Sequence, residues 1–323
     1  MVVVRTGQGM ANGRVMWQWL RLIFTIFAIG YIAWYLAAHS DKLAGLRIFT
    51  ATELALLLLL YLGDWAIRTV EFRYVIGRLG AAIGLIEALT IMSATSLLNY
   101  LPLNAGMFVR ARILKRHKDI PYALYIALMS LILFAAVSAS GLVGLIALFA
   151  HGGAGVWLIG DYHAGTVLVV LLACGIVAPI VVLRLPTGLV AERNLWLFDR
   201  LHALLQGWRR IDFRAYLYLC GLAVIKVVFL GFRLWICLRV LQVQDSLLLG
   251  ITFAAVSTII LIVNVTPSGI GIRELLIAAL AELLGVGFAD GMLAAGLDRV
   301  VAIVFAVASG APGLLYLRTR KML

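Results

Sequence analysis

The sequence has little charge and no stretch of average polarity long enough to form a separate soluble domain. Charged residues make up 13% of the 323 residues, whereas hydrophobic residues make up 64%. This balance excludes an ordinary soluble globular protein and is typical of a polytopic membrane protein. We therefore expect a single integral membrane domain over residues 1–323, all-α because lipid leaves no partner for an unpaired backbone group.

Residues that carry enzyme chemistry are also scarce. The three cysteines, Cys174, Cys220 and Cys237, fall inside apolar runs and lack the paired spacing of a disulfide framework or metal site. The five histidines fall in predicted loops or interfaces without ligand-type clustering. A P-loop, a dinucleotide-binding glycine motif, a His-Glu-x-x-His motif and a nucleophile elbow are all missing. We expect no catalytic residue, no cofactor and no metal, and favour a protein that is not an enzyme.

The charge that is present is mostly positive, with a formal net charge of +12. Most of the 27 Lys and Arg residues lie between apolar runs, while the predicted outer loops hold only Lys42, Arg47 and Arg239. This pattern is a topology signal and attracts anionic membrane lipids, so it does not indicate a nucleic acid partner. It predicts a multi-pass protein of the cytoplasmic (inner) membrane with both termini in the cytoplasm. The basic amphipathic stretch at about residues 184–214 is expected to lie in the inner interface.

Long apolar runs predict about six full transmembrane spans. In span two, Asp64 and Arg68 lie one helical turn apart and can pair with each other. Two further runs, 83–101 and 246–263, each end at a polar interruption. The six predicted spans are residues 20–38, 53–75, 121–150, 165–183, 215–241 and 291–317.

The two interruptions share one spacing, an Asn followed by Pro three residues later and by Gly four residues after that. Proline and glycine stop a helix, and in lipid such a break survives only inside protein or against a wet cavity. We therefore predict two re-entrant broken-helix hairpins, although an ordinary loop, or one full span and an interfacial helix, are alternatives. The predicted hairpin breaks are Asn99, Pro102 and Gly106 in the first hairpin, and Asn264, Pro267, Gly269 and Gly271 in the second.

Three full crossings separate the hairpins, which gives them opposite orientations. The chain is thus predicted to contain inverted repeats, repeat 1 at about residues 83–150 and repeat 2 at about 246–317, as in many transporters.

A half-helix that starts inside the membrane directs free N–H groups and a positive dipole end toward its site, which favours an anion. Arginines follow both predicted breaks, and two more cations lie in the span at 215–241. Donors, dipoles and arginine together fit a phosphate group. Glu274 and Asp298 are read either as static ion-pair partners, which we favour, or as proton-carrying carboxylates. The candidate substrate-binding residues are Arg110, Lys226, Arg233, Arg273, Glu274, Asp298 and Arg299.

The stretch from Pro267 to Glu274, with Asp298 and Arg299 in the following helix, resembles the C-terminal signature of the lysylphosphatidylglycerol synthase transmembrane-region family. Pro102, Gly106 and Arg110 are similar to its N-terminal signature, and the resemblance covers roughly residues 15–318. Met107 stands where many members have an acidic residue, so an acid-dependent role is not expected there. The bifunctional synthases also carry a soluble aminoacyl-transferase domain after their membrane region; with few residues after its last predicted span, this chain is not expected to carry out aminoacyl transfer.

The resemblance implies the membrane half alone, a flippase that moves an anionic lipid such as a phospholipid or a polyprenyl-phosphate-linked sugar. An alternative is an intramembrane transferase acting on a lipid-linked phosphate, for which Glu274 and Asp298 are the available carboxylates. A third hypothesis is a non-catalytic partner of a lipid-modifying enzyme, or a homo-oligomer, that uses the packing face at Ser140, Gly141 and Gly144.

Overall fold

The computed structural model describes residues 49–100, 105–152, 162–184, 212–243, 246–260, 269 and 271–320, and all regular structure within them is helical. The chain is an all-α polytopic membrane protein, as its composition predicts. Its described helices are α3 (Ala51–Arg78), α4 (Leu85–Leu98), α5 (Ala105–Lys118), α6 (Tyr122–Gly152), α7 (Tyr162–Arg184), α10 (Phe213–Val240), α11 (Leu247–Ile260), α12 (Ile272–Leu283) and α13 (Phe288–Thr319).

Five of these helices are long, and they coincide with five of the six predicted spans. Among the described residues, three helices could cross a membrane by length and composition alone: the Tyr122–Ala150 part of α6, all of α10 and all of α13. The 28 residues of α3 and the 23 of α7 fill two more predicted spans, and α3 carries charged residues in its middle. The predicted first span at 20–38, and residues 185–211 of the predicted interfacial segment, lie outside the described residues.

Local sequence fixes where α3 begins. The Thr50 hydroxyl accepts a hydrogen bond from the backbone N of Glu53 at 3.2 Å, and the Glu53 carboxylate accepts one from the backbone N of Thr50 at 2.9 Å. Two N–H groups that the first turn leaves without helical partners are satisfied in this reciprocal way. The helix is therefore anchored at its first residue despite its charged interior.

Two pairs of short helices occupy the positions of the predicted hairpins. In the first pair α4 ends at Leu98, with Asn99 as its C-cap, and α5 begins at Ala105; in the second α11 is followed by α12. The two helices of each pair are in contact. Gly269 and Gly271 have φ of 69° and 87°, a left-handed backbone that glycine tolerates best. The second break therefore needs both glycines. Of the predicted break residues, Pro102, Asn264 and Pro267 lie outside the described residues.

Gly106 differs from the prediction, because it does not break the helix. It is the second residue of α5, and a Cβ atom there would run into the backbone carbonyl of Thr95 on α4. Glycine at this position lets the two arms of the hairpin approach closely. The break itself therefore lies between Asn99 and Ala105.

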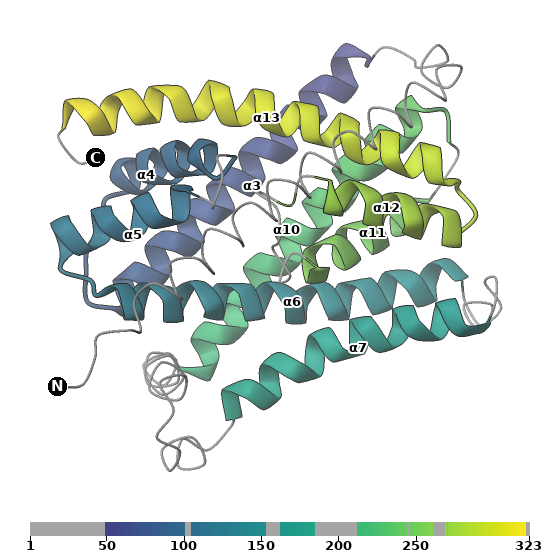
Figure 1. Cartoon of the computed structure of the whole chain (residues 1–323), viewed down its shortest axis with the longest axis horizontal. Coiled ribbons are helices and arrows are strands. Elements are labelled where there is room, and N and C mark those ends of the chain that lie inside the picture. Colours follow the sequence, from purple (N-terminus) through teal and green to yellow (C-terminus); the bar gives the residue numbers. More distant parts are fainter. Residues whose placement is uncertain are drawn as a thin grey trace, which may run out of the picture.

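The long helix after each hairpin packs against the other hairpin. In Figure 1, α13 lies along α4, and α6 lies along α11, and both pairs are among the most extensive helix contacts. Gly310 and Gly313 of α13 permit close approach, since a Cβ at Gly310 would come within 2.9 Å of the Ser93 carbonyl oxygen. The long helix of each predicted repeat thus packs on the hairpin of the other repeat, as expected of two related halves. The opposite orientation of the two halves in a membrane stays a prediction.

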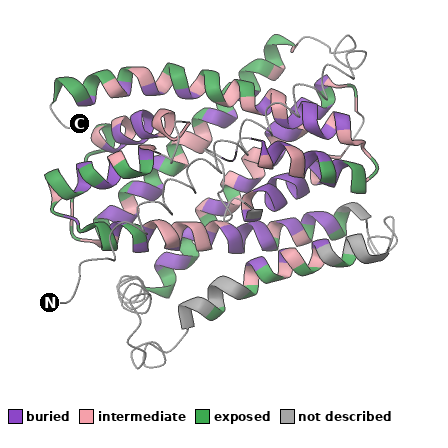
Figure 2. Ribbon diagram, viewed as in Figure 1, coloured by how far each residue is buried: buried purple, intermediate pink, exposed green. Residues whose placement is uncertain are grey.

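Buried residues concentrate where the halves meet. One apolar cluster joins α6, α7, α10, α11, α12 and α13 around side chains such as Phe253, and a second joins α3, α4 and α5 around Phe72. Figure 2 shows exposed residues along the outer sides of α13 and α7, while α11 is mostly buried. Exposed apolar side chains are what a surface in contact with lipid requires.

Candidate functional site

A cavity of about 330 Å³ lies between α3, α6 and α10, with single contributions from α4, α5 and α11. More than half of its lining residues are apolar, with Phe72, Met92, Met129 and Leu133 among them. The remainder, apart from Thr258, is charged, which is rare inside a membrane-embedded helix bundle and indicates a functional site. The charged lining residues are Asp64, Arg68, Glu71, Arg110, Lys226 and Arg233.

Lys226 of α10 reaches across this cavity to Glu71 of α3. Its Nζ atom lies 2.7 and 2.8 Å from the two carboxylate oxygens. Both side chains are largely shielded, with 14% of Lys226 and 5% of Glu71 exposed. Glu71 was missed by sequence reasoning; the only signal was an acidic residue inside a predicted span, seven positions after Asp64.

Arg233, also on α10, lines the cavity and contacts two residues outside the lining, Asp298 and Tyr61. Its Nε atom lies 3.0 Å from Oδ1 of Asp298, and its guanidinium stacks over the ring of Tyr61 at 3.9 Å. The Tyr61 hydroxyl donates to the same carboxylate oxygen at 2.6 Å. A planar guanidinium suits this combination of ring stacking and carboxylate pairing. This candidate substrate-binding residue is therefore also a partner in a buried ion pair.

Arg110 of α5 differs from the other cations of the lining, because no described carboxylate pairs with it. Only 9% of it is exposed, and its Nε and Nη2 atoms donate to the Thr95 hydroxyl at 3.1 and 2.7 Å. Its guanidinium also lies 5.5 Å from the centre of the Phe72 ring. Within the described ranges no carboxylate comes within ion-pair distance of it. By contrast, Arg68 and Asp64 form the pair that their spacing predicts, at 2.7 Å.

The charges around the cavity therefore do not balance. Arg68 is paired with Asp64, Lys226 with Glu71, and Arg233 with Asp298, which leaves the guanidinium of Arg110 as the surplus positive charge of the described lining. An uncompensated buried cation is costly, so an anion that enters the cavity gains from pairing with it.

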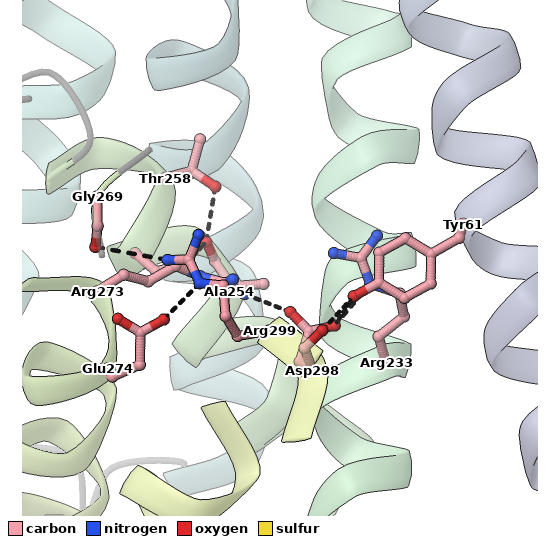
Figure 3. Close-up of polar contacts among 10 residues, drawn as sticks. Tyr61, Arg233, Ala254, Thr258, Gly269, Arg273, Glu274, Asp298 and Arg299 are labelled. Atoms are coloured by element: carbon pink, nitrogen blue, oxygen red, sulfur yellow. Dashed lines mark hydrogen bonds and ion pairs between the residues drawn. The ribbon is translucent and has the colours of Figure 1, made fainter. Parts of the chain in front are cut away.

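The other four predicted site residues form a separate cluster at the second hairpin (Figure 3). Asp298 of α13 lies between Arg233 on one side and Arg273 of α12 on the other, with Nη2 of Arg273 2.7 Å from Oδ2. Beside it, Nε of Arg299 lies 2.7 Å from Oε1 of Glu274. Neither α12 nor α13 contributes a residue to the described lining of the cavity. The candidate set thus divides into Arg110, Lys226 and Arg233 in the cavity, and Arg273, Glu274, Asp298 and Arg299 outside it.

The start of α12 also differs from the expected anion site. The backbone N–H of Gly271 donates to Oε2 of Glu274 at 2.7 Å, so the protein's own carboxylate caps this helix end. Both carboxylates of the cluster are buried and paired with arginines. That they act only as static partners stays a prediction. The cluster joins α12 to α13, and Asp298 extends it to α10 and α3.

Residues 18–310 match the family model described as the lysylphosphatidylglycerol synthase TM region. The chain belongs to this family. The match contains every described residue of the cavity and of the Asp298 cluster, and it confirms the resemblance seen in the two sequence signatures. A search among curated proteins and a search among solved structures each found no significant match. Membership in this transmembrane-region family places the chain among membrane-embedded proteins related to lipid synthesis or flipping.

Proposed function

We propose that this protein is a lipid flippase that moves a phosphate-bearing anionic lipid across the cytoplasmic membrane. The observation that carries the proposal is the buried guanidinium of Arg110, which lines the cavity without a described carboxylate partner. Lys226 and Arg233 line the same cavity, so a phosphate could contact three cations. The lipid tails stay in the bilayer while the head group crosses through the charged interior.

The size of the cavity favours a compact head group. A volume of about 330 Å³ is at the small end of ligand pockets. A phospholipid head fits that volume better than a long sugar chain on a polyprenyl phosphate. The transferase alternative relied on Glu274 and Asp298, and both pair with arginines outside the cavity lining. The carboxylates that do line the cavity, Asp64 and Glu71, are paired with Arg68 and Lys226.

The test is translocation of a head-labelled anionic phospholipid in liposomes that contain the purified full chain. Arg110→Gln is expected to slow translocation at least tenfold, because one charge-assisted phosphate contact contributes about 1.5–3 kcal/mol. Arg112→Gln is the matched control, since Arg112 lies two residues away on the same helix and is exposed. Equal rates for Arg110→Gln and the unmodified chain would sink the proposal.

A purified-protein assay separates the flippase from the transferase. Mass spectrometry of the lipid recovered after translocation should show the mass that was added. A lipid of altered mass, formed by purified protein in detergent, would instead establish the transferase.

A further inference from the structure

A second hollow lies beside α3, at residues that do not line the charged cavity. Its volume is about 370 Å³, and its lining comes from α3, the first residue of α4 and the first turns of α10. The two hollows share no lining residue within the described chain. We call this hollow the α3–α10 groove; its lining residues are Val70, Arg73, Tyr74, Gly77, Arg78, Leu85 and Tyr218.

The floor of the groove is apolar and faces outward. Val70 is 40% exposed and Leu85 is 49% exposed, although both lie in helices of a membrane-embedded bundle. Gly77 has open space where a side chain would stand, because a Cβ there meets nothing within 4 Å. An apolar channel with this exposure suits an acyl chain of a neighbouring lipid.

One rim of the groove carries two arginines held in fixed positions. Nε of Arg73 donates to the carbonyl oxygen of Ile83 at 3.1 Å, and in the described part of the chain its two terminal nitrogens have no acceptor. Arg78 donates to the Tyr74 hydroxyl at 3.0 Å and to the exposed carboxylate of Asp212 at 3.2 Å. Both guanidiniums are exposed. A planar guanidinium with free N–H groups matches a phosphate ester.

Two tyrosines lie beside these arginines. The rings of Tyr74 and Tyr218 lie 4.5 Å apart, which joins α3 to α10 along the groove. Tyrosine collects at the level of lipid head groups, where its ring meets the chains and its hydroxyl meets water. The groove therefore combines arginine, tyrosine and apolar residues, which suit the phosphate, the interfacial region and the chain of a lipid.

We propose that the α3–α10 groove binds one anionic glycerophospholipid, with its phosphate on Arg73 and Arg78 and an acyl chain over Val70 and Leu85. This site is separate from the cavity assigned to transport and does not depend on that assignment. Basic residues at the membrane surface attract anionic lipids in general, at about 1 kcal/mol for each charge. The groove adds a fixed geometry, so its affinity exceeds that of equal charge elsewhere on the same surface.

The experiment uses the purified full chain in detergent, titrated with short-chain phosphatidylglycerol at constant ionic strength. The midpoint of thermal unfolding and the bound lipid seen by native mass spectrometry are the readouts. All variants carry Arg110→Gln, which weakens the central cavity and leaves the groove as the site under test. Phosphatidylcholine and inorganic phosphate serve as probes for a zwitterionic head and for a free anion.

Removing both groove arginines, Arg73→Gln with Arg78→Gln, is expected to raise the phosphatidylglycerol concentration needed for half-maximal stabilisation about tenfold. Arg112→Gln with Arg116→Gln removes the same charge from exposed positions of α5. This control should change the half-maximal phosphatidylglycerol concentration less than twofold. Val70→Trp fills the groove without changing any charge and should abolish the bound lipid even if the arginine variant folds poorly.

Three results would each overturn the proposal. The first is an equal loss of phosphatidylglycerol affinity in the Arg112→Gln, Arg116→Gln control, which would mean that surface charge alone attracts the lipid. The second is an equal shift with inorganic phosphate, which would mean an anion site rather than a lipid site. The third is unchanged lipid binding by the Val70→Trp variant.

Discussion

Glu71 and Lys226 are 155 residues apart in the sequence, and their side chains meet at 2.7 Å across the charged cavity. Glu71 therefore occupies the position on Lys226 that an anionic head group would take. The carboxylate compensates the charge of Lys226 but not that of Arg110. Under the proposed function, a phosphate that contacts Lys226 competes with Glu71.

Replacing Glu71 by Gln should change how the protein responds to an anionic lipid. The unfolding midpoint of the empty protein is expected to fall, because breaking a buried ion pair costs about 3–5 kcal/mol. Added short-chain phosphatidylglycerol should then restore more stability than it adds to the unmodified chain. Glu87→Gln is the control, since Glu87 pairs with Lys118 at 3.3 Å away from the cavity. Equal lipid-induced shifts in both variants would contradict the competition.

Asp298→Asn should be among the most damaging single substitutions in the bundle. Asp298 has no exposed surface, and its loss leaves Arg233 and Arg273 facing each other without their shared carboxylate. We expect a loss of at least 3–5 kcal/mol of unfolding free energy, measured by thermal unfolding in detergent.

The comparison for Asp298→Asn is Asp212→Asn, in which the affected carboxylate is 71% exposed. An exposed pair of this kind contributes little to stability, because water screens it. Similar midpoints for the two variants would show that the Asp298 cluster does not hold α10, α12 and α13 together.

The contact between α13 and α4 can be tested with a single methyl group. Gly310→Ala places a Cβ within 2.9 Å of the Ser93 carbonyl, so we expect a loss of about 1–3 kcal/mol from overpacking. Gly296→Ala on the same helix meets nothing within 4 Å and should be neutral or stabilising. Thermal unfolding of both variants measures the difference in stability. Equal stabilities would mean that α13 is not closely packed against α4 at Gly310.

Gly106→Ala tests whether the close approach of α5 to α4 positions Arg110. The added methyl must displace α5 from the Thr95 carbonyl, which moves the guanidinium relative to the Thr95 hydroxyl that holds it. We expect lipid translocation to fall at least tenfold, since small misplacements of a binding group have effects of this size. Gly221→Ala in α10 adds a methyl in open space and should keep full activity. Full translocation activity of Gly106→Ala would show that the close approach of α5 to α4 is not needed to position Arg110.

Helix positions followed from the sequence because apolar runs and charged ends are local properties. The predicted span at 215–241 became α10 at Phe213–Val240, and the half-helix predicted after Gly271 became α12 at Ile272–Leu283. The Asp64–Arg68 pair was also predictable, since four residues along a helix make one turn.

The division of the site could not be predicted in the same way. Arg110 and Arg273 follow similar motifs, yet Arg110 faces the cavity and Arg273 pairs with Asp298. Which carboxylate each cation meets depends on helix packing between distant segments, and spacing along the chain does not report it. The helical position of Gly106 was missed for a related reason, because its role is set by the Thr95 carbonyl on another helix.

The exchange of long helices between the two hairpins has a consequence for biosynthesis. The packing partner of α4 is α13, which begins about 190 residues later in the chain. At the usual speed of translation, the ribosome needs roughly 10–40 seconds to make that stretch. During this time the face of α4 around Ser93 and Leu97 is without its partner. The first hairpin therefore completes its folding only after the last helix has entered the membrane.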